Sequence, residues 1–322
     1  MRILNNESNK HVVKKRIRIV FFSMVTLLVL FVLFTIIQKD QFFLLHKEYR
    51  HQAFNEKIPL NNVFANETVH FNDEGAYKAF YLELKNNTQK NKSTTLLLKD
   101  AMIWLPVIEK ILIQYKIPTD FKYIAMVESN FKNVVSSREA VGFWQLKAGT
   151  AIDLGLEVNE EVDERLDPIK ATHAACRFIK QAHKEFDSWT ITAAAYNRGI
   201  GGIQKALAAQ NKTSYYDLDL NSETAKYLYK LLAAKDLVEH PSKYGLKLYN
   251  WKREPVRAII VTATIDNLDV FARNNGTNLY VLKLYNPWLL KNSLTIKDAG
   301  TIYKIELPHL KVLAKKDSIP VA

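Results

Sequence analysis

The stretch YIAMVESNF at residues 123–131 decides the fold, because it sets a single carboxylate, Glu128, among apolar residues that favour a helix. The segment Pro118-Thr119-Asp120 lies just ahead of it, and Thr119 or Asp120 can cap the helix that carries Glu128. A carboxylic acid held in an apolar setting keeps its proton nearer to neutral pH than an exposed acid does. The stretch therefore predicts a helix that presents a protonated carboxyl group.

The sequence on both sides of this stretch, from residue 99 to residue 240, has apolar residues at steps of three and four. The same spacing predicts further helices, which include Ile103 to Leu112, a helix from Pro168 to just before Asp187, one that starts near Thr190, and one from about Ser222 to Val238. We therefore predict a mainly α fold whose central part, residues 99–240, is a small helical domain.

Three more motifs follow Glu128 in order. They are GFWQL at 142–146, AAAYNRG at 193–199 and SETAKY at 222–227. This order and spacing resemble the catalytic domain of the lytic murein transglycosylases. The resemblance implies a lysozyme-like fold, peptidoglycan glycan strands as the partner, and cleavage of the β-1,4 bond between N-acetylmuramic acid and N-acetylglucosamine. It implies no cofactor, and the scattered histidines form no metal-ligand spacing.

In this family one glutamate acts as general acid and then as general base, and the resemblance gives that role to Glu128. The C6 hydroxyl of the N-acetylmuramic acid attacks its own anomeric carbon, so no water is consumed and a 1,6-anhydro sugar forms. Hydrolytic glycosidases ordinarily need a second carboxylate. Glu139 is a candidate for it, and a hydrolytic muramidase is therefore the first alternative. A glycan-binding scaffold with an inactive domain is the second.

The resemblance also assigns substrate contacts to residues of the four motifs. Their expected roles are as follows: Ser137 lies beside the substrate or the acid, Gly142 lets a sugar approach the backbone, Gln145 bonds an N-acetyl group, Tyr196 orients Glu128, Asn197 lies across the cleft, and Glu223 and Tyr227 complete the fourth motif. Two of the motifs also have purely structural interpretations. Trp144 fits either the core or the cleft wall, and Glu223 is favourable at a helix N-terminus in any case.

Residues 19–38 form an uncharged apolar run long enough to cross a bilayer as a helix. Several cations precede it: Lys10, Lys14, Lys15, Arg16 and Arg18. The positive-inside rule then predicts a cytoplasmic tail at 1–18, a single-pass anchor in a bacterial inner membrane, and a catalytic domain in the periplasm. A cleaved signal peptide and a buried helix are the alternatives. Residues 39–98, which have polar runs and little apolar periodicity, are interpreted as a stalk.

Residues 255–310 predict a small β-α-α-β module. A β-branched run at 258–262 indicates a strand, short helical patterns cover 265–273 and 278–285, and a second strand closes at 301–308. This order resembles a diverged lysin motif, a module that binds glycan containing N-acetylglucosamine. The usual Gly-Asp-Thr turn is replaced here by Ala263-Thr264-Ile265. A module that only packs against the catalytic domain is therefore the alternative.

Composition narrows the partners further. The 322 residues are 48% apolar, enough for real cores, and carry a net charge of +12. The cations are spread along the chain without interleaved aromatic residues, so nucleic acid is not expected as a partner. A polyanionic wall or an anionic membrane surface fits this charge better. The only cysteine, Cys176, excludes a disulfide within the chain and is expected to be an ordinary buried helix residue.

Overall fold

The computed structural model describes residues 62–71, 74–88 and 92–309. The predicted cytoplasmic tail, the predicted anchor at 19–38 and residues 39–61 of the predicted stalk lie outside these ranges. Within the described ranges, no helix combines the length and the hydrophobicity that crossing a bilayer requires.

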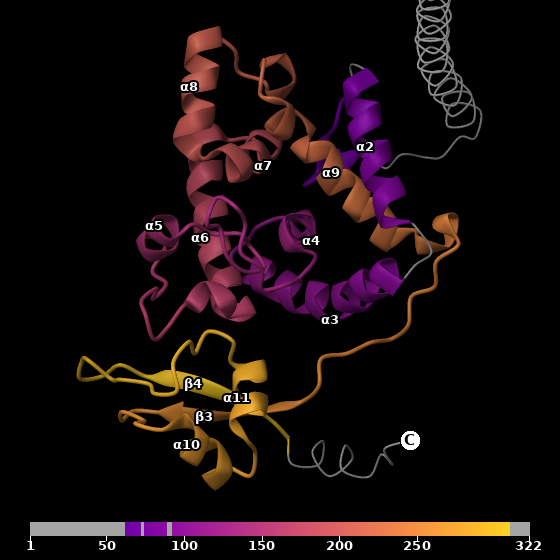
Figure 1. The fold of residues 1–322 in the computed structure, drawn as a ribbon. Coiled ribbons are helices and arrows are strands. Elements are labelled where there is room, and N and C mark those ends of the chain that lie inside the picture. Colours follow the sequence, from indigo (N-terminus) through magenta and orange to yellow (C-terminus); the bar gives the residue numbers. More distant parts are fainter. Residues whose placement is uncertain (1–61, 72–73, 89–91, 310–322) are drawn as a thin grey trace, which may run out of the picture. The chain divides into compact units, whose positions relative to one another are not determined.

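The described chain is mainly helical, as predicted (Figure 1). Its longer helices are α2 (Glu74–Asn87), α3 (Lys92–Gln114), α4 (Tyr123–Ser129), α5 (Ala148–Asp153), α6 (Pro168–Phe186), α7 (Trp189–Arg198), α8 (Ile200–Gln210) and α9 (Ser222–Glu239). Short 3-10 turns, among them η1 (Thr119–Lys122), connect some of them. The helices expected around Glu128, from Pro168, from Thr190 and from Ser222 are all present within a few residues.

Side-chain caps explain where three of these helices begin. The Asp167 carboxylate accepts from the backbone N–H groups of Ile169 and Lys170, and Pro168 fills the first helical position of α6. Ser188 caps α7, and Asn221 caps α9 by accepting from the Thr224 N–H at 2.9 Å. The Asn221 cap lies directly before the fourth motif at the start of α9, whereas the third motif lies at the end of α7 opposite to the Ser188 cap.

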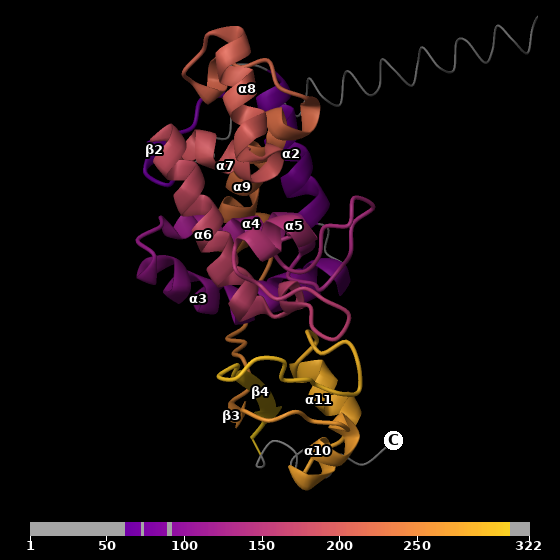
Figure 2. The same cartoon turned by 90° about the vertical axis from the view of Figure 1, so that its left-hand side faces the viewer.

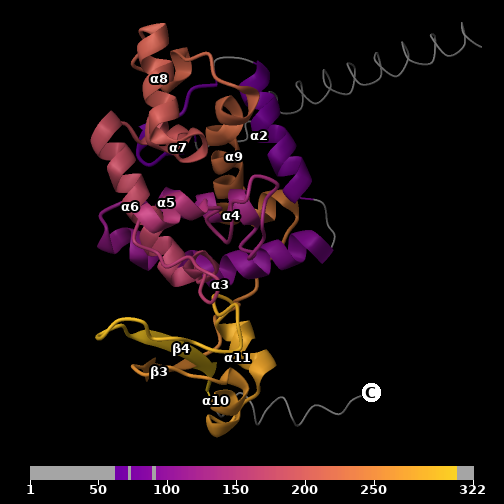
Figure 3. The same cartoon turned by 60° about the vertical axis from the view of Figure 1, so that its left-hand side comes forward.

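Helix α9 packs against α2, α4 and α7, and Figures 1 and 3 show it between α2 and α7. It buries residues around most of its circumference, including Leu228, Leu231 and Leu237. A helix that is apolar on nearly all sides belongs in a core. Because α4 and α7 contact the same helix, α9 brings the motif of Glu128 close to the motif of Tyr196.

The prediction of a stalk is wrong for residues 62–71, 74–88 and 92–98, because these residues belong to the helical domain, in which 92–98 begin α3 with Leu97 and Leu98 buried. Strands β1 (Val63–Phe64) and β2 (Glu67–Thr68) form a short hairpin, and α2 packs along α9. The Glu67 carboxylate accepts from the N–H of Trp189 at 2.5 Å and of Thr190 at 2.9 Å, so it caps α7 from a distant part of the chain. The buried stripe of α2 is short and lies among polar residues, which hid it in the sequence: Ala76, Ala79, Phe80 and Leu84.

The C-terminal module has the predicted β-α-α-β order: β3 (Val256–Val261), α10 (Leu268–Asn274), α11 (Leu279–Tyr285) and β4 (Tyr303–Pro308). The strands are antiparallel, with Val256 opposite Pro308 and Val261 opposite Tyr303. Figure 2 shows the two strands side by side with both helices beside them. Leu268, Leu282, Trp288 and Ile305 belong to the module's core.

Candidate active site

Glu128 lies near the C-terminal end of α4, which Asn130 terminates in a left-handed conformation. Its side chain is half-buried, and its Oε1 accepts a hydrogen bond of 2.6 Å from the Tyr227 hydroxyl on α9. Burial raises the pKa of Glu128 above its ordinary value. The Tyr227 hydrogen bond and the charge of Lys230 act against this rise, while the charge of Glu223 adds to it.

Glu128 opens into a hollow of about 520 Å³. The walls come from the end of α4, the loop after it, the start of α5, the middle of α6, the end of α7 and the start of α9. Five residues that were predicted as substrate contacts line this hollow: Ser137, Gln145, Tyr196, Asn197 and Glu223. The sequence reasoning missed Arg138, Lys147, Phe178 and Arg198 as lining residues.

Arg165 and Asp163 hold the loop that carries Ser137 and Gln145. The Arg165 guanidinium donates to the carbonyl oxygens of Leu146 at 3.2 Å and Glu139 at 3.4 Å. Asp163 accepts from the same guanidinium at 2.9 and 2.7 Å, and both side chains are buried. A buried bidentate pair of this kind fixes geometry strongly. We call residues 134–146 the cleft loop.

Gly142 lies within the cleft loop, but its role differs from the predicted one. It has a φ of 82°, and a Cβ at this position would lie 2.1 Å from the carbonyl oxygen of Arg165. Gly142 is also not among the residues that line the hollow. The glycine is therefore needed for the approach of the Arg165 backbone, not for the approach of a sugar.

Gln145 points its amide nitrogen into the cleft loop itself. Nε2 donates to the carbonyl oxygens of Val134 at 3.1 Å and Gly142 at 2.9 Å. Because both hydrogens of the amide group are engaged, its oxygen is the atom that can accept a hydrogen bond from a ligand.

Tyr196 lines the hollow but does not orient Glu128, so this expectation is wrong. Its hydroxyl donates to the Trp144 carbonyl oxygen at 2.7 Å, and Tyr227 makes the bond to Glu128 instead. Burial, together with the nearby charge of Glu128, raises the pKa of Tyr196 well above its ordinary value. Trp144 is fully buried and its indole N–H bonds the Thr172 hydroxyl at 2.9 Å, so Trp144 is a core residue.

Asn197 and Glu223 form one polar network across the hollow. The Asn197 amide donates to Glu223 at 3.2 Å and accepts from the Thr224 hydroxyl at 2.8 Å. Arg138 reaches Glu223 at 3.4 Å from the cleft loop. Glu223 is thus the second carboxylate on this wall, whereas Glu139, the candidate expected from the sequence, is exposed and lies outside the lining.

Two other expectations concern metal and thiol chemistry. In the described part of the chain, no three His, Cys, Asp or Glu side chains converge as metal ligands would. Cys176 is fully buried in α6, as predicted, and burial raises the pKa of its thiol to about 12.

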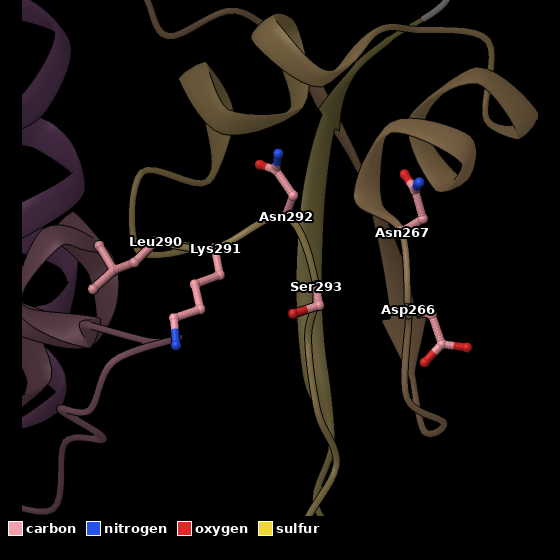
Figure 4. A pocket seen from close by; sticks show the side chains of 6 residues that line it. All are labelled: Asp266, Asn267, Leu290, Lys291, Asn292 and Ser293. Atoms are coloured by element: carbon pink, nitrogen blue, oxygen red, sulfur yellow. The ribbon is translucent and has the colours of Figure 1, made fainter.

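A second hollow, of about 530 Å³, lies in the C-terminal module (Figure 4). Asp266 and Asn267 border it on one side and residues 290–293 on the other. Several of these groups already have partners. Asn267 caps α10, and the Lys291 amine and the Ser293 hydroxyl bond to the carboxylates of Glu160 and Glu161, each at 2.9 Å.

Comparison with known proteins gives two domain matches. Residues 107–218 match the family model described as the transglycosylase SLT domain. Residues 257–311 match the soluble lytic transglycosylase C-terminal LysM-like domain.

Curated relatives and solved structures give more distant matches. The chain is 29% identical over 222 residues to membrane-bound lytic murein transglycosylase D of two Escherichia coli strains, K12 and O6:H1. The match covers 66% of this chain and 48% of each relative, so the chain spans about half the length of these curated relatives.

Among solved structures, an inactive mutant of lytic transglycosylase Slt from Pseudomonas aeruginosa aligns with a TM-score of 0.41 and 17% identity, over 54% of this chain and 30% of that one. The 70 kDa soluble lytic transglycosylase from Escherichia coli aligns with a TM-score of 0.38 and 17% identity, over 55% and 37%.

Proposed function

We propose that this chain, which carries a transglycosylase SLT domain followed by a LysM-like domain, is a lytic transglycosylase of peptidoglycan. The single observation that carries the proposal is the setting of Glu128. It is a half-buried carboxyl group with a raised pKa, it has a hydroxyl donor on one oxygen, and it opens into a hollow. A general acid for glycosidic cleavage needs these properties.

In the proposed reaction Glu128 starts protonated. The Tyr227 hydroxyl donates to Oε1, so the proton of the acid belongs on Oε2, the oxygen left for the substrate. As the bond between the anomeric carbon and the bridging oxygen breaks, that proton moves to the bridging oxygen, which leaves as a hydroxyl of N-acetylglucosamine. The acetamido group of N-acetylmuramic acid helps to stabilise the cationic intermediate.

Glu128 is then a carboxylate, and the Tyr227 hydrogen bond stabilises this form. It takes the proton of the C6 hydroxyl of N-acetylmuramic acid while that oxygen bonds to the anomeric carbon. The product is a 1,6-anhydro end, Glu128 is protonated again, and no water is consumed. One carboxyl group thus serves as acid and base in turn.

The other residues of the hollow bind the substrate in this proposal. The Gln145 amide oxygen accepts from an acetamido N–H, and the exposed Ser137 contacts the sugar at the rim. Tyr196 forms part of the wall. Asn197 and Glu223, which are bonded to each other, brace the far side.

A hydrolytic muramidase is the second candidate, and one observation favours it: Glu223 is a second carboxylate on the same hollow. Hydrolysis would need Glu223 to activate water or to attack the sugar. Its engagement by Asn197 and Arg138 argues against both roles.

The same proposal extends to the fold of the catalytic domain and to the location of the chain. The catalytic domain at 99–240 would have a lysozyme-like fold and act in the periplasm, residues 1–18 would be cytoplasmic, and residues 19–38 would anchor the chain in a bacterial inner membrane. Residues 255–310 would meet the glycan at the hollow of Figure 4. The apolar run and the cations before it support the anchor.

Mass spectrometry of muropeptides tests the reaction. The full chain, purified in mild detergent, is incubated with purified peptidoglycan beside the Glu128→Gln and Glu223→Gln variants. Products lighter by one water than reducing muropeptides, absent with Glu128→Gln and retained with Glu223→Gln, are expected. Reducing ends that depend on both carboxylates would establish a hydrolase instead. No cleavage by the folded chain would leave a binding protein.

A further inference from the structure

The C-terminal module contacts the catalytic domain through a segment that also holds the cleft loop. Residues 157–164 form this segment, in which Val158 bridges Asp163 and the backbones of Glu157 and Glu164 bond each other. We call it the docking segment. Its outer edge faces the module, and Arg165, which directly follows it, reaches the cleft loop.

The contact on the module side has the form of a short antiparallel bridge. Val162 pairs with Leu289, the Leu290 N–H donates to the Glu161 carbonyl at 2.8 Å, and the Asp163 N–H donates to the Trp288 carbonyl at 2.9 Å. The Val162 side chain is 1% exposed and belongs to the core of the module. The docking segment is therefore built into the module's core and is more than a surface contact.

Side chains reinforce this bridge at three places. Glu161 accepts from the Ser293 hydroxyl at 2.9 Å and from the Thr295 N–H at 3.2 Å. The Tyr303 hydroxyl donates to Glu157 at 2.7 Å. The amine of Lys170, on α6, lies 5.3 Å from the centre of the Trp288 ring. Two groups on the rim of the module's hollow, Lys291 and Ser293, are thus used to bind the catalytic domain.

The contact on the cleft side starts from Asp163, whose N–H bonds the module. Its carboxylate holds the Arg165 guanidinium, which donates to the carbonyls of Leu146 and Glu139. The Arg165 carbonyl packs where a Cβ of Gly142 would be. A chain of direct contacts therefore runs from Trp288 through Asp163 and Arg165 to the loop that carries Ser137 and Gln145.

We propose that docking of the C-terminal module on the docking segment sets the position of the cleft loop, with Asp163 and Arg165 as positioning residues. The module then contributes to cleavage by shaping the cleft, without touching the sugar bond. The expected effect of docking on cleavage rests on the proposed function, whereas its expected effect on the position of the cleft loop does not.

Amide hydrogen exchange on the full chain tests the conformational part. Glu161→Gln combined with Tyr303→Phe weakens the docking, and Glu161→Lys, which faces Lys291, weakens it by repulsion. Asp269→Asn is the matched control, because it removes the carboxylate of a surface pair with Arg273 inside the module. Exchange at Val141, Gly142 and Leu146, whose N–H groups are bonded within the cleft loop, is expected to rise roughly fivefold or more in the docking variants. It should stay unchanged in the control and in α6.

Kinetics on soluble glycan strands tests the consequence for cleavage. The docking variants and Arg165→Lys are expected to raise KM by about tenfold or less, while kcat and the pH profile, which report Glu128, stay unchanged. Faster exchange at 288–295 with no change at the cleft loop would overturn the proposal. Unchanged exchange both at 288–295 and at the cleft loop in Glu161→Lys would also overturn it, because the contacts of the docking segment would then not hold the module. If the chain cleaves no glycan, exchange still decides whether the module positions the loop.

Discussion

The Tyr227 hydroxyl lies 2.6 Å from Oε1 of Glu128, and this bond joins the central helix α9 to the end of α4. A hydroxyl that donates to one carboxyl oxygen leaves the other oxygen to hold and transfer the proton. The bond also favours the carboxylate, which a general acid must become during the reaction. The balance between burial, which raises the pKa of Glu128, and this bond, which lowers it, gives the first predictions.

Replacement of Glu128 by Gln should abolish cleavage and leave the fold intact. General acid catalysis contributes about 10²–10⁴-fold, so activity should fall at least about a thousandfold when the same group serves as acid and base. At neutral pH the variant should also have a free energy of unfolding about 1 kcal/mol higher than the parent. The reason is that the substitution removes a carboxylate whose charged form is disfavoured by burial.

The sign of that stability effect follows from the raised pKa of Glu128. The folded chain binds this proton more tightly than the unfolded chain does, so the stabilisation is complete at acidic pH and is lost as pH rises through the raised pKa. Thermal unfolding of both proteins should therefore show a gain for Glu128→Gln that grows from acidic to neutral pH. A gain that shrinks over this range would contradict the assignment.

Removal of the Tyr227 hydroxyl should shift the pH profile of kcat to higher pH. Tyr227→Phe loses the bond that lowers the pKa of Glu128, so the alkaline limb of kcat should shift to higher pH. The maximal rate should fall about tenfold to a hundredfold, because the carboxylate formed during the reaction loses its donor.

Tyr196→Phe is the matched control for this change. It removes a hydroxyl on the same hollow that bonds the Trp144 carbonyl and not Glu128. This variant should lose about 1 kcal/mol of stability and keep the position of the alkaline limb. A larger shift in Tyr196→Phe than in Tyr227→Phe would mean that the two tyrosines exchange roles when substrate binds.

Replacement of Glu223 by Gln should shift the alkaline limb of kcat in the direction opposite to that expected for Tyr227→Phe. The charge of Glu223 raises the pKa of Glu128, so its removal should move the alkaline limb to lower pH. The products should remain anhydro ends, because Glu223 takes no proton in the proposed reaction. A shift to higher pH, or complete loss of cleavage with Glu128 intact, would give Glu223 a direct chemical role.

The helices and the position of Glu128 could be predicted from the sequence because periodicity and spacing are local properties. The partner of Glu128 could not. Tyr196 and Tyr227 are both candidates for this bond in the sequence, and only the packing of α7 and α9 decides which hydroxyl reaches the acid. The link from Asp163 to the cleft loop was equally hidden, since it joins residues whose closeness depends on a buried ion pair.

Gly142→Ala should destabilise the chain strongly, and the reason lies in the link between the cleft loop and Arg165. A Cβ at this position would lie 2.1 Å from the Arg165 carbonyl, and the φ of 82° is unfavourable for any residue with a side chain. The loss should be about 3 kcal/mol, measured by denaturant unfolding, because the backbone of Arg165 must shift.

Gly149→Ala is the matched control. A Cβ there meets no atom within 4 Å, and the residue lies in α5. Gly149→Ala should therefore raise the free energy of unfolding by about 0.5–1 kcal/mol. If the two substitutions had equal effects on the free energy of unfolding, the Arg165 backbone would not be in close contact with the cleft loop. A loss of cleavage by Gly142→Ala at a temperature where it stays folded would show that the position of this loop limits the reaction.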